Sequence, residues 1–162
     1  MPPLFSVVIP TYNQADFLRI ALRSVLDQTC QDFEVILVNN FSEDHTLDVI
    51  QEVGDSRITS INFRNNGVIG ASRNVGIRAS EGRYVAFLDS DDAWYCNKLA
   101  KVAEVISAEP NIGLVCHDQD MFRYGEKSIV ARTGPREGYH DSIYNYLLLQ
   151  SNCISTSSAV VE

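Results

Sequence analysis

The sequence predicts an α/β domain with a mostly parallel central sheet and helices on both faces of that sheet. Short apolar runs alternate with segments whose apolar residues recur at helical spacing. The runs are rich in β-branched residues and are bounded by polar residues or glycine, as buried strands are. Regular alternation of strands and helices is typical of parallel sheets that are covered on both sides.

Five strands and four helices are expected in the first 117 residues. The strands comprise residues 6–9, 33–38, 57–63, 83–88 and 112–116. The helices comprise residues 17–26, 47–53, 71–79 and 99–106. Gly54, Gly82 and Pro110 follow three of these helices and end them.

The alternation stops near residue 118, where polar residues and glycines become frequent. We expect an edge strand at residues 128–132, a helix at 142–150 and a further strand at 155–161. At 162 residues the chain has the size of one domain, so residues 1–162 are expected to fold together. Because the sequence stops inside the last expected strand, we expect it to be part of a longer protein.

Composition restricts the class of protein. With 45% hydrophobic residues the chain is globular, and its net charge of −8 argues against a nucleic-acid partner. The spacing of the four cysteines matches neither a zinc site nor a disulfide-rich secreted domain. No apolar run approaches the ~20 residues that span a bilayer. These features predict a cytoplasmic protein, and they leave peripheral contact with the inner face of the membrane open.

Three carboxylates follow the apolar run at residues 83–88, and they are the strongest indication of a site. In open α/β sheets ligands bind at the carboxyl ends of the strands, where Asp89 and Asp91 are expected. Hard oxygen ligands of this kind suit Mg²⁺ or Mn²⁺. The alternative is that Ser90, Asp91 or Asp92 caps the helix that follows.

The turn after the first strand contains Pro10, Thr11 and Tyr12. Proline lacks an amide donor and ends the strand, and Thr11 can form hydrogen bonds. The ring of Tyr12 can stack on a nucleobase or, alternatively, support the turn from within.

The second strand is followed by Asn39 and Asn40, whose side-chain amides both donate and accept and are therefore suited to a base edge. Ser42 or Asp44 is expected to cap the next helix. His45 is expected in the first turn of that helix and not as a metal ligand, because no second His or Cys lies near it.

The segment at residues 65–76 combines glycines with the start of a helix, an arrangement whose backbone amides can approach an anion. Arg73 adds a guanidinium suited to a diphosphate. The segment is neither the dinucleotide fingerprint nor a Walker A loop.

Four segments in order, at residues 6–13, 38–46, 67–82 and 87–92, together resemble family 2 glycosyltransferases of the Rossmann-like GT-A fold. The likeness covers nearly the whole chain and corresponds to the donor-binding half of such enzymes. It implies a core at residues 1–117 and the start of an acceptor-side region at 118–162.

The resemblance assigns the nucleotide-sugar site to Pro10, Thr11, Tyr12, Asn40, Arg73, Asp89 and Ser90, with Asp91 and Asp89 as ligands of Mn²⁺ or Mg²⁺. Thr11 and Tyr12 would contact the base and ribose, and Arg73 the diphosphate. Members of the family usually carry Asp-Asp where this chain has Asn39 and Asn40, and the second Asp accepts from the base. Asn40 can accept through its oxygen but can also donate, so a UDP-sugar is favoured and the identity of the base stays open.

The implied activity is metal-dependent, inverting transfer of a hexose from a nucleoside-diphosphate sugar to a hydroxyl of a glycan or lipid-linked acceptor, in polysaccharide assembly. No general base is assigned, because the acidic residue that serves in the family is expected beyond Glu162, and the chain alone is expected to be inactive. Asp118 is expected to have a structural role. The alternatives are a non-catalytic nucleotide-sugar-binding module and a sugar nucleotidyltransferase, although the latter would require a glycine-rich basic loop after the first strand.

Overall fold

A computed structural model describes residues 1–123, 126–134, 147 and 152–162. Its main feature is a six-stranded sheet in the order β3-β2-β1-β4-β8-β5, with a separate two-stranded sheet formed by β6 and β7. The strands are β1 (Phe5–Thr11), β2 (Phe33–Asn39), β3 (Ile58–Asn62), β4 (Tyr84–Phe87), β5 (Leu114–Val115), β6 (Gln119–Arg123), β7 (Glu126–Ala131) and β8 (Val160–Val161). The helices are α1 (Ala15–Leu26), α2 (Thr46–Val53), α3 (Ile69–Ala79) and α4 (Lys98–Ala108), with a short 3₁₀ turn at Thr156–Ser158.

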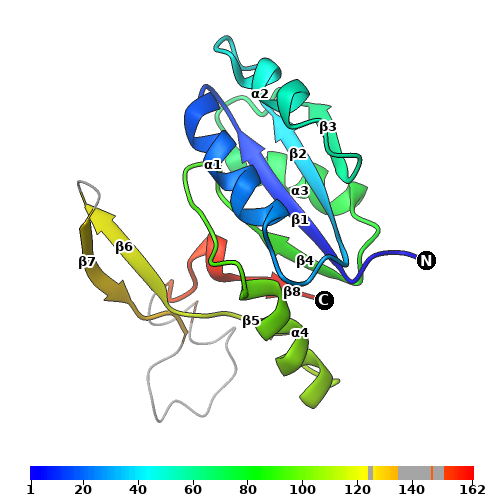
Figure 1. The fold of residues 1–162 in the computed structure, drawn as a ribbon, viewed down its shortest axis with the longest axis vertical. Helices are drawn as coiled ribbons and strands as arrows, with labels where there is room; N and C mark the ends of the chain where they lie inside the picture. Colours follow the sequence, from blue (N-terminus) through cyan, green and yellow to red (C-terminus); the bar gives the residue numbers. More distant parts are fainter. Residues whose placement is uncertain (124–125, 135–146, 148–151) are drawn as a thin grey trace.

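Helices cover both faces of the sheet, as the sequence predicts (Figure 1). Along β1, Val7 and Ile9 pack with α1, α2 and α4, whereas Val8 points to the opposite face and packs with α3. Alternate strand residues point to opposite faces, so a continuous apolar strand needs a helical layer on each side. This packing confirms the predicted α/β fold class.

Strands β1 to β4 are parallel to one another, so the carboxyl ends of β1, β2 and β4 meet at one edge of the sheet. The register pairs Thr11 with Asn39 at the last position of β1 and β2. Residues that follow these strands are therefore neighbours in space although they are far apart in the sequence.

The carboxyl-terminal part differs from the prediction. Strand β8 lies between β4 and β5 and is antiparallel to both. The single strand expected at residues 155–161 is wrong in part, because the 3₁₀ turn at Thr156–Ser158 precedes the short β8. The edge strand expected at 128–132 is β7, which pairs with β6 in a hairpin beside the main sheet (Figure 1).

The helix expected at residues 142–150 lies outside the described residues, apart from Leu147. The division into residues 1–117 and 118–162 stays a prediction. None of the helices in the described part of the chain is long and apolar enough to cross a membrane.

Candidate functional site

A cavity of about 400 Å³ lies at the carboxyl ends of β1, β2 and β4. All of the predicted site residues except Arg73 line it. Gln14, Asn65, Gly67 and Ile69 also line it and were not assigned from the sequence. A larger open hollow is lined by the consecutive residues 109–114 of one loop, so it brings no separate elements together.

The turn after β1 contributes a buried threonine and an exposed aromatic ring. The carbonyl of Thr11 accepts a hydrogen bond from the Asn40 backbone amide at 3.0 Å, which joins the ends of β1 and β2. Its hydroxyl Oγ1 is buried and has no partner among the described residues. Tyr12 is 51% exposed and lines the cavity, so its ring is accessible to a ligand.

The segment between β2 and α2 is held against the start of α1. Asp44 accepts hydrogen bonds from the backbone amides of Ala15 at 3.0 Å and Thr46 at 3.1 Å, the first residues of α1 and α2. Asp44, one of the two residues expected to cap α2, therefore does bond the first amide of that helix. His45 directly precedes α2 without a side-chain capping bond, and Asp44, one residue earlier, bonds the first amide. His45 lies 3.1 Å from Asp16 of α1 and does not line the cavity.

The two asparagines after β2 have different roles. Asn39 is buried, donates to Asn62 Oδ1 at 2.9 Å and accepts from the Ser42 amide at 3.0 Å, so its role is structural. Asn40 lines the cavity, and its Oδ1 accepts from the backbone amide of Asn65 at 2.9 Å.

The loop before α3 is shaped by a third asparagine, Asn65. Asn65 donates to Ser72 Oγ at 3.0 Å and accepts from the Gly67 amide at 2.9 Å. Gly67 has a φ of +81°, a conformation that favours glycine. This turn brings Asn65 and Gly67 into the wall of the cavity.

Arg73 on α3 forms an ion pair with Asp89, with Nη2 and Oδ1 2.6 Å apart. Its Nε is buried and has no partner among the described residues. In this structure the guanidinium holds Asp89 and does not line the cavity. Its contact with a diphosphate stays a prediction.

Gln14 connects the acidic loop to the start of α1. Ser90 donates to its Oε1, and its Nε2 lies 3.5 Å from Asp91 Oδ2. Sequence reasoning missed this residue because a single polar residue before a helix gives no separate signal. Asp91 itself is exposed and lines the cavity.

Ser157 connects the carboxyl-terminal segment to the acidic loop. Its Oγ accepts from the Asp89 amide at 3.0 Å, and its carbonyl accepts from Trp94 Nε1 at 2.9 Å and Lys98 Nζ at 3.0 Å.

Burial lowers the pKa of Lys98 well below its ordinary value. Lost hydration raises the pKa of Asp92, a Ser157 hydrogen bond opposes this rise, and the neighbouring charges of Asp91 and Asp89 add to it.

The oxygen ligands of the loop fit a divalent cation only in part. Asp89 and Asp91 supply hard carboxylate oxygens, but one oxygen of Asp89 is paired with Arg73. No group of three or more His, Cys, Asp or Glu side chains is arranged to hold a metal within the described residues. Mg²⁺ is commonly held by one or two carboxylates, substrate phosphates and water. The residues therefore fit a cation whose remaining ligands come from a bound diphosphate and water.

Fold and site together define an α/β protein with a ligand cavity at the carboxyl edge of its sheet. The chain belongs to glycosyl transferase family 2, whose model matches residues 6–159. The predicted family and its GT-A fold are thereby confirmed.

Curated relatives carry related names. The chain is 41% identical over 104 residues to a putative teichuronic acid biosynthesis glycosyltransferase, TuaG, of Bacillus subtilis, covering 63% of this chain and 41% of the relative. It is 38% identical over 108 residues to the Escherichia coli protein WfaP, named as a UDP-Glc:alpha-D-GlcNAc-diphosphoundecaprenol beta-1,3-glucosyltransferase, covering 65% and 42%. The chain thus matches about two fifths of the length of these relatives.

Among solved structures, TarS 1-349 of S. aureus in complex with UDP-GlcNAc is similar, with a TM-score of 0.70 and 27% identity. The likeness covers 81% of this chain and 38% of that one.

Proposed function

We propose that this chain is the donor-binding part of a glycosyltransferase that uses a nucleoside-diphosphate sugar, with a UDP-sugar favoured. The observation that carries the proposal is the composition of the cavity. The exposed ring of Tyr12 and the amide of Asn40 come from the β1 and β2 ends, and Asp89 and Asp91 come from the β4 end. An aromatic and amide surface beside an acidic, metal-compatible surface suits a ligand with a base at one end and a diphosphate at the other.

The comparisons support this donor class. The TarS structure contains UDP-GlcNAc, and the name of WfaP specifies a UDP-glucose donor and a diphosphoundecaprenol-linked acceptor. By analogy, the whole protein would transfer a hexose to a hydroxyl of a glycan or lipid-linked acceptor with inversion, in polysaccharide assembly. An acceptor of this kind would place the activity in the cytoplasm at the inner face of the membrane.

Each cavity residue has a proposed role. Tyr12 stacks on the base and Thr11 lies beside the ribose, in the turn that Pro10 begins. Asp91, supported by Gln14, is the main ligand for Mn²⁺ or Mg²⁺. Asp89 also contributes to the cation site, and Ser90 fixes the position of the loop between the two carboxylates.

A bound cation would neutralise charge on the leaving diphosphate. Arg73 then contributes by holding Asp89 in place and by supplying positive charge near the diphosphate.

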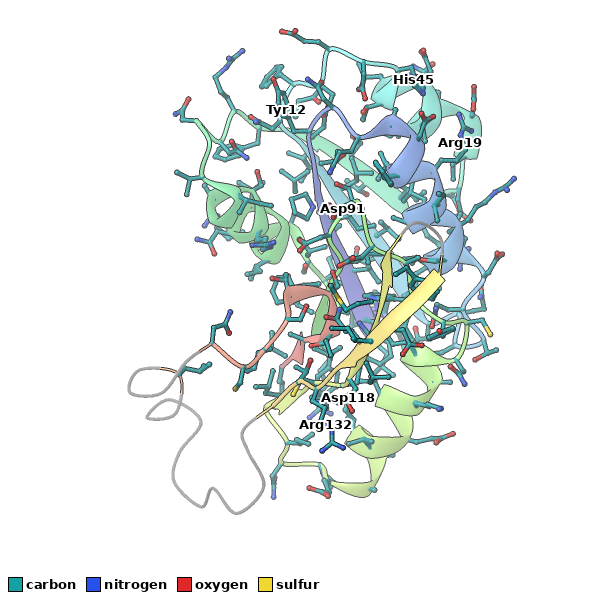
Figure 2. The ribbon with its side chains drawn as sticks, turned by 90° about the vertical axis from the view of Figure 1, so that its left-hand side faces the viewer. Tyr12, Arg19, His45, Asp91, Asp118 and Arg132 are labelled. Carbon is teal, nitrogen blue, oxygen red and sulfur yellow. The ribbon has the colours of Figure 1, made fainter. Side chains whose placement is uncertain are left out.

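Asp118 is not proposed as a general base. Its Oδ1 accepts from the Thr133 amide at 2.9 Å, and it lies well apart from Tyr12 and Asp91 (Figure 2).

Calorimetric titration with UDP, with and without Mn²⁺, tests the proposal on the chain and on Asp91→Asn. We expect Mn²⁺ to strengthen binding about tenfold or more, and the variant to lose most of that gain, because a charged ligand to the cation is removed. Asp48→Asn is a matched control that removes the same charge from the exposed face of α2, outside the cavity. Absence of nucleotide binding, or equal Mn²⁺ dependence in chain and variant, would contradict the proposal.

A further inference from the structure

We propose that Asn40 contacts the base as a hydrogen-bond donor, so that the base site itself binds UDP and CDP with similar affinity and a preference for a UDP-sugar comes from contacts beyond the base. The inference rests on the proposed function, because it assumes that a nucleotide occupies the cavity. An asparagine side chain can present either an oxygen acceptor or an amide donor, and the sequence leaves both open. The contacts of Asn40 decide between them.

The oxygen of Asn40 already accepts one hydrogen bond. Its Oδ1 accepts from the backbone amide of Asn65 at 2.9 Å. A backbone amide can only donate, so this contact assigns the oxygen and the nitrogen of the Asn40 side chain. The Nδ2 group is neither buried nor hydrogen-bonded to any described residue, while Asn40 lines the cavity. Asn40 therefore offers its amide hydrogens to a ligand.

Two neighbouring side chains offer no free acceptor at the cavity surface. Asn65 also lines the cavity, but its Oδ1 accepts from Gly67 and its Nδ2 donates to Ser72. The hydroxyl of Thr11 is buried below the cavity surface. Of the amide groups of Asn40 and Asn65, the Nδ2 donor of Asn40 thus lacks a partner among the described residues.

Pyrimidine bases differ in what they present to such a donor. Uracil carries an N–H donor at N3 between two carbonyl acceptors, whereas cytosine carries an acceptor at N3 and a carbonyl at C2. Asn40 Nδ2 can therefore donate to either base, and neither base is rejected by an unpaired group at this position. A carboxylate at the same place would accept from uracil N3–H and would repel the N3 lone pair of cytosine.

Asn40→Asp tests the inference with almost no change in shape. The new carboxylate retains an oxygen that accepts from the Asn65 amide, and it replaces only the donor. Asn66→Asp is the matched control: it adds the same charge to the adjoining loop before α3, at an exposed residue that does not line the cavity. Its φ of +52° is one that Asp tolerates.

The experiment measures dissociation constants for UDP and CDP in the presence of Mn²⁺, for the chain and both variants. We expect the two nucleotides to differ by less than about threefold in the unchanged chain. In Asn40→Asp the ratio of the CDP to the UDP dissociation constant should rise by about tenfold or more, because hydrogen bonds to charged groups are stronger and cytosine is repelled. Asn66→Asp should weaken the binding of both nucleotides alike and leave the ratio of their dissociation constants unchanged.

A tenfold or greater preference of the unchanged chain for UDP over CDP would overturn the inference and leave the proposed function intact. An unchanged ratio in a folded Asn40→Asp variant would overturn it as well. Because the ratio in the unchanged chain is itself decisive, the test does not depend on the variant folding. Absence of binding by any nucleotide would overturn the inference together with the proposed function.

Discussion

The carboxylate of Asp55 holds the turn between α2 and β3. Its Oδ1 accepts from the backbone amide of Arg57 at 2.9 Å and from Nε at 3.0 Å, and its Oδ2 accepts from Nη2 at 2.8 Å. The side-chain and backbone hydrogen bonds from Arg57 lower the pKa of Asp55 to about 2. The Arg57 guanidinium also lies 4.4 Å from the centre of the Phe33 ring, at the start of β2.

Asp55→Asn should lower the free energy of unfolding by about 1 kcal/mol at neutral pH, because the paired carboxylate is partly exposed and screened. A lowered folded-state pKa adds stability above the unfolded value of 3.8 that is lost as the pH falls through about 2. The difference between chain and variant should therefore be constant above ~pH 5 and shrink toward pH 2. Urea unfolding across this range measures it.

Glu104→Gln is a suitable control, because Glu104 is exposed on α4 and its side chain has no hydrogen bond to a described residue. Its effect should be small across the same pH range. A difference for Asp55→Asn that stayed constant down to pH 2 would show that the carboxylate does not stabilise the turn by its charge.

Site prediction at the residue scale succeeded where the chemistry of a residue restricts its role. Local sequence is enough to identify acids that follow a buried strand and an aromatic residue in the turn at a strand end. Asp91 and Tyr12, which were predicted in this way, do line the cavity. The ion pair between Arg73 and Asp89 could not be predicted from the sequence. Sixteen positions separate the two residues, and only the packing of α3 on the sheet brings them together.

Helix α3 contacts the sheet through a glycine. A Cβ atom added to Gly76 would lie 2.3 Å from Val8 Cγ1 on β1, so the helix approaches the strand more closely than a side chain allows. Sequence periodicity predicted the helix but gave no reason for this residue. Only the distance between the two elements explains it.

Gly76→Ala should therefore destabilise the fold by about 1–3 kcal/mol, because α3 must move away from β1. Gly70→Ala in the same helix is the matched control. Nothing lies within 4 Å of its added Cβ, and the higher helix propensity of alanine should give up to ~1 kcal/mol of extra stability. Guanidinium unfolding of both variants measures the contrast, and equal effects would show that the close approach at Gly76 is not a constraint.

The hairpin of β6 and β7 was largely missed at the element scale. Met121 and Phe122 on β6 and Ile129 and Val130 on β7 are exposed. Because these exposed apolar residues are adjacent in the sequence, they do not alternate with polar residues, and the period-2 signal is weak.

At the scale of the whole molecule, residues late in the chain support a loop formed much earlier. The segment that leads into β8 lies beside β4 (Figure 1). From this segment Ser157 bonds the Asp89 amide, Trp94 and Lys98. The acidic loop is thus positioned by a residue 68 positions away from Asp89 in the sequence.

Ser157→Ala should lower the free energy of unfolding by about 1–3 kcal/mol, because it leaves the Asp89 amide without its partner. It should also reduce the gain in UDP affinity from Mn²⁺ several-fold, since Asp89 and Asp91 are no longer fixed in position. Calorimetric titration with and without Mn²⁺ measures this second effect.

Ser158→Ala is the matched control. Ser158 is equally buried in the same turn, but its hydroxyl donates to the Ser155 carbonyl at 2.7 Å and not to the acidic loop. It should cost about 1 kcal/mol and leave the Mn²⁺ effect unchanged. If both variants reduced the Mn²⁺ effect equally, the contact between Ser157 and Asp89 would have no specific role in the site.

The sequence by itself determined the fold class, the strands that build the centre of the sheet and the polar residues at their ends. These properties depend on hydrophobic periodicity and residue chemistry, which are local. Tertiary structure alone decided that β8 inserts antiparallel beside β4, that Arg73 engages Asp89 and that the Asn40 oxygen is taken by Asn65. Each of these depends on which groups meet across the fold, and hydrogen-bond partners distant in the sequence leave no local pattern.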